Sequence, residues 1–450
     1  MRHTSWLALA ALLAAACGSV SNPSADGGPS DGDSGAGEPD AAVPGPVAVR
    51  VLSEDGRRQP LSEVPVAFFQ PDGSLAQVVT TDQDGLASAE IAAGGAVLAF
   101  ATQLIEGGPG YPRAMGVLDV HPGDEITLGG PSYFQLPPTH SMQLQTPTAS
   151  GATTYFVETP CGYFPGSPDQ GAGLVTYSID FYDTCNDSPF SLVASARSAD
   201  GLEQKTLVHS GVEIADQTTF AASAEWQDLG TTLVSIDGMS ADLRVVGAQY
   251  VRGIVGGSAM PTSLFDVREE VSSATLSLNP RHVSQLDSAL LHVRVNHEQS
   301  LLGQQILEIW ADERDEIELP FDELLLPWFG TPLVDLGSHS ITVPQVGAGE
   351  WDATYLFFNW YTRREGELVE GYWTLVVPPG VTSAVFPAVP EEFADWLPAD
   401  IDDIYAYGKV IERSDLDGWH DARQLGLDPF HGIAPEGTAN VRTSFMGGAD

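Results

Sequence analysis

Basic residues are scarce in this chain, and the shortage limits its partners. Lysine and arginine together number 19, against 61 aspartates and glutamates, which gives a formal net charge of −42 in 450 residues. Binding of nucleic acid requires a concentrated basic patch, so we expect no nucleic-acid partner. A strongly acidic surface instead favours solubility and weak binding of cations such as calcium.

The motifs of common catalytic sites are also missing. No Gly-x-Ser-x-Gly nucleophile elbow occurs, and the nearest segment, Gly257-Ser258-Ala259, lacks the second glycine. The sequence has no His-Glu-x-x-His zinc motif and no phosphate-binding glycine loop. Because acidic residues are so abundant, a pair of carboxylates carries almost no information about a glycosidase. We therefore expect no enzyme activity and no cofactor, with an envelope hydrolase as the least favoured alternative.

Apolar runs are short, and the clearest one stands at the N-terminus. Arg2 and His3 precede an apolar stretch from Trp6 to Ala16. This stretch is too short for a stable transmembrane helix, which needs roughly 20 residues. A basic start followed by a short apolar segment and small residues is the pattern of an export signal. We expect residues 1–16 to be a signal peptide.

The end of this segment reads Leu13-Ala14-Ala15-Ala16-Cys17-Gly18, which resembles the lipobox of bacterial lipoproteins. The resemblance implies that cleavage leaves Cys17 first, that its thiol takes a diacylglycerol and that its amine is acylated. Several acyl chains on one residue give stable membrane anchoring. Gly18 after the cysteine, where Asp could stand, resembles lipoproteins sent to the outer membrane. The alternative is an ordinary secreted protein with a chance cysteine at the cleavage site.

Residues 17–46 have the composition of a spacer. Beyond Cys17 the segment consists mainly of Gly, Ser, Pro, Ala and Asp, and it contains five acidic residues but no Lys or Arg. Such a stretch cannot bury enough apolar surface to offset chain entropy. We expect a disordered linker that holds the folded part away from the bilayer.

Cysteine is equally sparse, since only Cys161 and Cys185 remain once Cys17 carries lipid. An even number of cysteines in an oxidising compartment predicts a disulfide, which would stabilise the fold by roughly 3 kcal/mol. It would attach a long loop, Gly162 to Gly173, to the sheet. A metal pair or a reactive thiol is the alternative.

The rest of the chain predicts an all-β fold of tandem antiparallel β-sandwiches. It contains 47 glycines and 32 prolines and little helical periodicity. Between Ser288 and His297 the apolar residues Leu291, Val293 and Val295 alternate with polar ones, as in a half-buried strand. Val175, Tyr177, Ile179 and Phe181 repeat the alternation. We expect folded domains at 47–130, 131–229 and 230–450, the last being one large sandwich or two small ones.

The first domain carries a family resemblance. Strands are predicted at 47–52, 64–69, 77–81, 88–91 and 95–101, and Thr81 to Ala87 forms the turn before the fourth. This order resembles the transthyretin-like regulatory domain of carboxypeptidases and also bacterial immunoglobulin-like adhesin repeats. The resemblance implies a small β-sandwich with a structural or binding role and no catalysis of its own. The order of the domains resembles uncharacterised lipoproteins of Gram-negative bacteria.

The third domain contains the candidate ligand residues. We expect helical turns at 391–396 and 401–407 and strands elsewhere, including one near Phe357. Exposed aromatic rings can stack on sugars, so a carbohydrate-binding surface is one hypothesis. Its tentative residues are Trp351, Tyr355, Trp360, Tyr372 and Trp373. The alternative is core packing, because Tyr355 and Phe357 on one face and Leu356, Phe358 and Trp360 on the other make both faces of the strand apolar.

Metal sites are weakly indicated. His292 and His297 point to opposite faces of one strand, so they cannot share an ion without a bulge. A second candidate combines His420, His431, Asp415, Asp417 and Asp421, for which solvated loop residues are the favoured interpretation. Asp-x-Asp-Gly occurs at 82–85 and 415–418, a spacing that calcium loops use. Gln424 stands where the second copy would need a closing Glu, so we expect no bound metal.

Taken together, these patterns predict a membrane-anchored envelope lipoprotein with a non-catalytic binding or scaffolding role. A protein or a glycan of the envelope is the expected partner.

Overall fold

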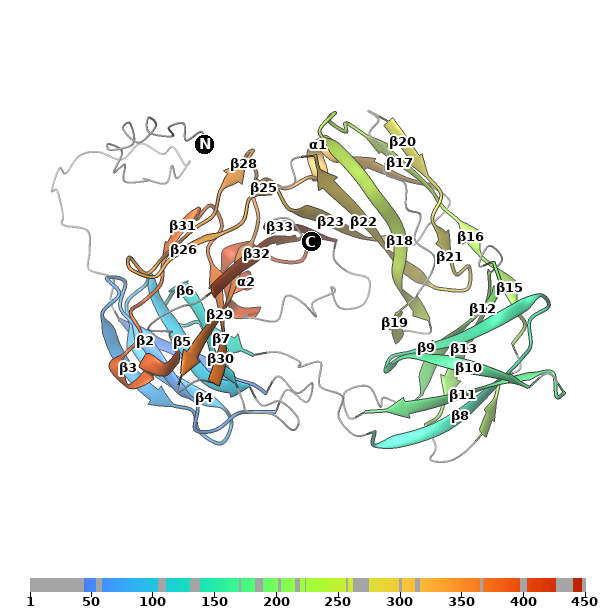
Figure 1. Ribbon diagram of the computed structural model, residues 1–450, viewed down its shortest axis with the longest axis horizontal. Coiled ribbons are helices and arrows are strands. Elements are labelled where there is room, and N and C mark those ends of the chain that lie inside the picture. Colours follow the sequence, from blue (N-terminus) through green and yellow to red (C-terminus); the bar gives the residue numbers. More distant parts are fainter. Residues whose placement is uncertain are drawn as a thin grey trace, which may run out of the picture. The chain divides into compact units, whose positions relative to one another are not determined.

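The computed structural model describes most of the folded part of the chain (Figure 1). The described residues are 44–53, 59–103, 111–129, 138–169, 171–182, 189–200, 204–214, 219–222, 224–255, 258–261, 275–298, 302–311, 316–364, 367–396, 403–425 and 440–446. They all belong to one unit, Ala42–Asp450. The predicted signal peptide, Cys17, Cys185 and His431 lie outside the described residues, as does nearly all of the predicted linker.

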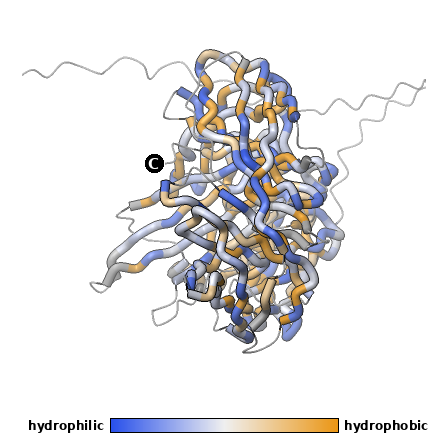
Figure 2. Tube along the Cα trace, turned by 90° about the vertical axis from the view of Figure 1, so that its right-hand side faces the viewer, coloured by the Kyte–Doolittle hydropathy of each residue, from blue (hydrophilic) through white to orange (hydrophobic). Residues whose placement is uncertain are grey.

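Strands dominate the described residues, which confirms the predicted all-β fold. The helices among them are α1 (Phe321–Leu324), the 3-10 helix η1 (Glu391–Trp396) and α2 (Trp419–Leu425). None of the helices in the described ranges is long and apolar enough to cross a bilayer. In Figure 2 hydrophobic and hydrophilic segments alternate along the chain trace, and no long stretch of the described residues is hydrophobic throughout. In β22 (Ser288–His297) the apolar members Leu291, Val293 and Val295 are buried, as the alternation predicts.

The first predicted domain forms two packed sheets. The smaller sheet has the order β4 (Leu86–Ile91), β1 (Gly45–Val51), β7 (Glu125–Leu128). The larger one includes β3 (Leu75–Thr80), β2 (Pro65–Phe69), β5 (Gly95–Gln103) and β6 (Tyr111–Val120). Val49, Phe68 and Val117 are among the apolar side chains buried between them. All five strands predicted from the sequence in this domain are present.

The larger sheet continues far beyond the first domain. In the described part of the chain it has 14 strands, of which 12 follow one path. Beyond β6 that path runs through β30 (Glu367–Val377), β29 (Ala353–Arg364), β32 (Asp403–Arg413), β33 (Val441–Met446), β23 (Gln304–Ala311), β22, β18 (Leu243–Val255) and β19 (Ser258–Pro261). Beside this path, β25 (Trp328–Phe329) pairs with β33 and with β28 (Gln345–Val346).

A parallel pair of strands joins the first predicted domain to the third. β6 pairs with β30, with Arg113 opposite Tyr372 and Val117 opposite Val376. The first predicted domain and the third therefore share one hydrogen-bonded sheet. Where the domain boundaries fall stays a prediction.

Several central strands of this sheet are buried on both faces. On one face Tyr355 and Phe357 join the core beneath β1, β4 and β7. On the other face Leu356, Phe358 and Trp360 join a second core. That core is covered by η1 and by a small sheet of β26 (Leu333–Asp335), β27 (Ser340–Thr342) and β31 (Ser383–Val385). The result is three layers, as expected for a strand that is apolar on both faces.

The middle of the chain builds a third core. An eight-stranded sheet has the order β14 (Thr219–Ala221), β8 (His140–Pro147), β11 (Leu174–Phe181), β10 (Gly162–Asp169), β9 (Ala152–Thr159), β12 (Phe190–Ser198), β13 (Gln204–Val212), β15 (Gln227–Asp228). Its apolar face forms one cluster with β18, β22 and the short strands around them. These short strands are β16 (Gly230–Thr231), β17 (Leu233–Asp237), β20 (Thr275–Leu278), β21 (Arg281–His282) and β24 (Glu316–Pro320).

Two local predictions are wrong. The segment 401–407 is not a helical turn, because β32 occupies residues 403–413 and its ladder with β29 supplies the backbone hydrogen bonds. The predicted loop from Gly162 to Gly173 is mostly strand β10, which lies between β9 and β11. For β32 the pairing is with a strand far away in the sequence, whereas β10 pairs with the strands directly before and after it; in both cases pairing overrides the local signals. The helical turn at 391–396 is confirmed as η1.

Close packing at one glycine allows a stability test of the central layer. Gly371 lies opposite Trp360, and an added Cβ would overlap the indole, with Cη2 only 2.8 Å away. Trp360 is fully buried, so its ring cannot move aside without disturbing the core. We expect Gly371→Ala to lose about 1–3 kcal/mol in chemical denaturation. Gly337→Ala is the control, since its nearest contact would be 3.3 Å away in a turn. Equal stability of the two variants would contradict the packing.

Candidate functional site

The aromatic residues predicted to bind a ligand are mostly core residues. Trp360 and Trp373 are 0% and 1% exposed, and Tyr355 and Trp351 are 3% and 6% exposed. A stacking surface needs ring faces open to solvent, and in these four residues the faces are covered. The core-packing alternative therefore describes them. Tyr372 differs, because it is only half-buried.

Trp351 lies at the edge of a cavity, although its ring belongs to the core. The indole packs edge-on against Phe329 at 5.5 Å and donates a hydrogen bond to Thr354 at 2.9 Å. The cavity has a volume of about 520 Å³, and Trp419, Glu412 and Arg442 also line it. Arg442 and Glu412 form an ion pair at 2.7 Å, so these charges already compensate each other.

The histidine and aspartate candidates are dispersed among structural contacts. His292 pairs with Glu308 at 3.7 Å, whereas His297 lies 4.0 Å from Asp242. Asp415 accepts two hydrogen bonds from the Arg413 guanidinium, which lower the pKa of the Asp415 carboxyl. No cluster of three or more potential metal ligands occurs in the portion of the chain that is described.

The first Asp-x-Asp-Gly segment is a turn. One carboxylate oxygen of Asp82 accepts hydrogen bonds from the backbone N–H groups of Asp84 and Leu86, both at 2.9 Å. Gly85 adopts a left-handed φ of +70°. An aspartate that caps its own turn in this way is a common feature of hairpins. Cys161 lies in the turn between β9 and β10, and its predicted disulfide with Cys185 stays a prediction.

An exposed group of tyrosines lies elsewhere on the large sheet. Tyr405 and Tyr407 on β32 are 56% and 50% exposed. Strand register places them on the same face as half-buried tyrosines of the neighbouring strands β29, β30 and β6. We call this group the tyrosine surface; it consists of Tyr111, Tyr361, Tyr372, Tyr405 and Tyr407, together with Asn359 and Glu370.

The rings of the tyrosine surface contact one another across the strands. Tyr111 meets Tyr372 edge-on at 5.9 Å, and Tyr361 meets Tyr405 at 6.0 Å. Tyr407 stacks on Phe357 at 5.2 Å, at the border of the core under β1. The tyrosine surface is thus the uncovered continuation of a buried sheet face, and the strands hold its rings in place.

Glu370 links the hydroxyl groups. Its Oε1 accepts a hydrogen bond from Tyr361 at 2.7 Å and another from Tyr372. The bond to the carboxylate raises the pKa of Tyr361, while burial and the same carboxylate raise the pKa of Tyr372. Burial also raises the pKa of Tyr407. These tyrosines therefore stay neutral hydrogen-bond donors at physiological pH.

Only Tyr372 of this surface was among the residues expected from the sequence. Tyr405 and Tyr407 were assigned to a helical turn, although their alternation with Ile404 and Ala406 is a signal for a strand. Tyr111 joins the group only through the parallel pairing of β6 and β30, which no local pattern indicates.

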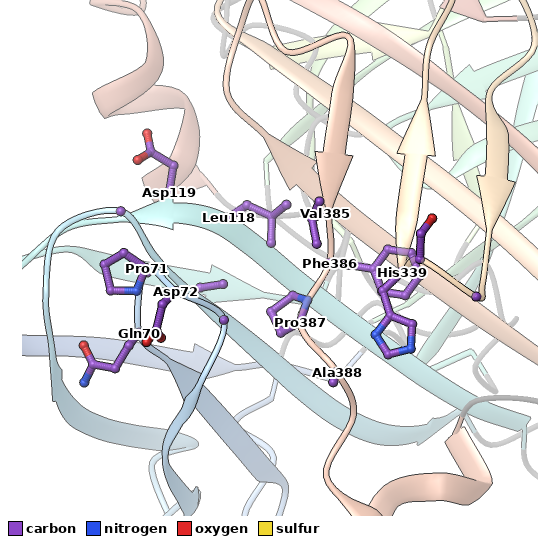
Figure 3. A pocket seen from close by; sticks show the side chains of 16 residues that line it. Gln70, Pro71, Asp72, Leu118, Asp119, His339, Val385, Phe386, Pro387 and Ala388 are labelled. Carbon is purple, nitrogen blue, oxygen red and sulfur yellow. The ribbon is translucent and has the colours of Figure 1, made fainter. Parts of the chain in front are cut away.

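A separate cleft lies where the β2–β3 and β26–β27 turns approach β6 and the segment after β31 (Figure 3). It has a volume of about 450 Å³, and Leu118, Val385 and Pro387 give it an apolar floor. His339, which has a left-handed φ of 50°, stacks on Phe386 with ring centroids 5.5 Å apart. The cleft contains two acidic side chains, Asp72 and Asp119, but both are engaged in other contacts.

Those contacts define the roles of the two acids in the cleft. Asp72 accepts hydrogen bonds from the hydroxyl and the backbone N–H of Ser74, which lower the pKa of the Asp72 carboxyl. Asp119 accepts a hydrogen bond from the Trp419 indole at 3.0 Å. Both carboxylates thus serve a turn or a helix contact, and the tyrosine surface is the better candidate site.

Comparison with known proteins assigns the chain to no family. No family model and no curated protein matches the sequence. Among solved structures, the chain is similar to the Bacillus anthracis TIE protein at 11% identity and a TM-score of 0.15, covering 62% of this chain and 50% of that one. It is also similar to the major pilin subunit BcpA of Bacillus cereus, at 8% identity and a TM-score of 0.16, covering 62% and 98%. The chain spans about half of the TIE protein.

Proposed function

We propose that this protein is a lipoprotein of a bacterial outer membrane, anchored through Cys17, that binds a partner non-catalytically through the tyrosine surface. The observation that carries the binding role is the tyrosine surface itself. Five aromatic rings on four adjacent strands are exposed or half-buried. Tyrosine supplies a large and rigid contact area at low entropic cost, which makes it frequent in binding surfaces.

The anchor is supported by the N-terminal sequence. A short apolar segment ends at Cys17, and a stretch without Lys or Arg follows it. A lipid on Cys17 would hold the protein at a membrane, and the stretch after it would give the folded part reach. The proposal includes export into an oxidising compartment, where Cys161 and Cys185 would form a disulfide.

Replacing Cys17 tests the anchor. In a lipoprotein-competent bacterium, we expect wild-type protein in the membrane fraction, with a fatty-acylated N-terminal peptide in mass spectrometry. Cys17→Ser should shift the protein almost entirely to the soluble fraction, since the acyl chains provide the membrane affinity. Cys161→Ser is the control, because it leaves the lipobox intact. A wild-type protein released to the medium with a free N-terminal thiol would overturn the anchor.

A further inference from the structure

The tyrosine surface combines exposed aromatic rings with polar groups on the same strands. One row of paired residues crosses this surface from β5 to β32. It contains one small apolar side chain and no branched aliphatic side chain; its members are Ala101, Arg113, Tyr372, Asn359 and Tyr405. Exposed rings with hydroxyl and carboxylate groups beside them suit a ligand that has apolar faces and polar edges.

The polar groups between the rings offer hydrogen bonds to such a ligand. Glu370 accepts two tyrosine hydroxyls, and an ionised carboxylate has about four lone-pair sites, so acceptor capacity is left. Oδ1 of Asn359 is buried and has no hydrogen-bond partner within the described residues. Its amide donates to the Tyr361 hydroxyl at 3.3 Å, so Asn359 positions a ring of the surface, while its buried oxygen is not open to a ligand. A ligand rich in hydroxyl groups could both donate to the Glu370 carboxylate and accept from the tyrosine hydroxyls.

Charge decides between neutral and acidic ligands. The formal net charge of the chain is −42, so a polyanion would be repelled at low ionic strength. Sugar rings present an apolar C–H face to an aromatic ring and hydroxyl groups at their edge. We propose that the tyrosine surface binds neutral glycans, whose rings stack on Tyr405 and Tyr407 and whose hydroxyl groups bond to Glu370 and to the tyrosine hydroxyls. This inference rests on the proposed function, because it names the partner of the same surface.

Two soluble polymers that share a cellulose backbone and differ in charge test the inference. Full-length protein in detergent would be titrated with neutral hydroxyethylcellulose and with anionic carboxymethylcellulose. We expect binding of the neutral polymer, and about tenfold weaker binding by the Tyr405→Ala, Tyr407→Ala double variant. Tyr163→Ala is the matched control, since Tyr163 is 44% exposed on β10, outside the tyrosine surface. Equal binding of the anionic polymer would contradict a neutral ligand.

A second arm uses bacterial envelope material, which separates failure of the inference from failure of the proposed function. Samples are treated with protease or with periodate, which oxidises sugars. Tyrosine-dependent binding that survives protease and is lost after periodate supports a glycan. Tyrosine-dependent binding that only protease removes overturns the glycan and leaves the proposed function standing. Binding that is the same in wild type and in the double variant, in both arms, overturns both.

Discussion

Replacing Arg423 by methionine should destabilise the protein by about 3–5 kcal/mol, because the change leaves a carboxylate buried without its counter-ion. Arg423 on α2 holds Asp124 with two contacts of 2.9 Å, one from Nε and one from an η nitrogen. The two side chains are 6% and 2% exposed. Asp124 also accepts the backbone N–H of His121 at 2.7 Å, so the turn before β7 depends on it.

Chemical denaturation of three variants would check this result. Arg442→Met is the matched control, because its partner Glu412 and Arg442 itself are each about one quarter exposed. A partly exposed pair is worth only about 0–1 kcal/mol. The double variant Asp124→Asn, Arg423→Met should lose less than the sum of its single changes, since no charge stays buried alone. A loss at Arg423 no larger than that at Arg442 would refute the assigned role.

Lys409→Met should be most stabilising near pH 7 and should lose this advantage as the pH rises toward 10.5. Lys409 is 5% exposed on β32, and burial lowers the pKa of its ammonium from 10.5 to about 7, against a smaller opposing effect of Glu308. Between these values the unfolded chain binds a proton that the folded chain does not bind. Folding is therefore penalised, and the stability of the wild type rises with pH across this window.

The size of the effect follows from the pKa difference. A fall from 10.5 to about 7 corresponds to a penalty on the order of 5 kcal/mol at neutral pH, which methionine removes. The measurement is the free energy of unfolding of both proteins from pH 6 to 10. Lys205→Met is the control, because Lys205 is 38% exposed beside Asp228 at 3.7 Å, and its difference from wild type should stay nearly constant. A constant difference for Lys409→Met would mean that this lysine is charged in the folded protein.

Where both faces of a strand are apolar, its position between two cores could be predicted from the sequence. The strand around Phe357 has apolar residues on both faces, and the structure places it between two cores as β29. The helical turn expected at residues 401–407 is wrong, because strand β32 lies there. There the strand conformation comes from neighbours on both sides, β29 and β33, which lie far away in the sequence.

The candidate site was harder to predict, because its residues meet only through the register of the sheet. Tryptophans such as Trp360 suggested a ligand surface by their number, yet large rings are also the best material for a core. Whether a ring is exposed depends on whether another sheet covers it, and the part of the large sheet that lies beneath β1, β4 and β7 is covered. Tyr405 and Tyr407 are open because they lie on β32 beyond the buried part of that face.

The parallel ladder between β6 and β30 has a consequence for biosynthesis. A chain emerges N-terminus first, so β6 is made long before β30 can occupy its edge. Until then Phe100 and Leu118, which pack on residues from the C-terminal third, have nothing to cover them. A nascent or truncated chain thus presents an open strand edge beside an apolar face, a combination that promotes aggregation. Completion of the first domain's sheet is therefore tied to strands that are translated about 250 residues later.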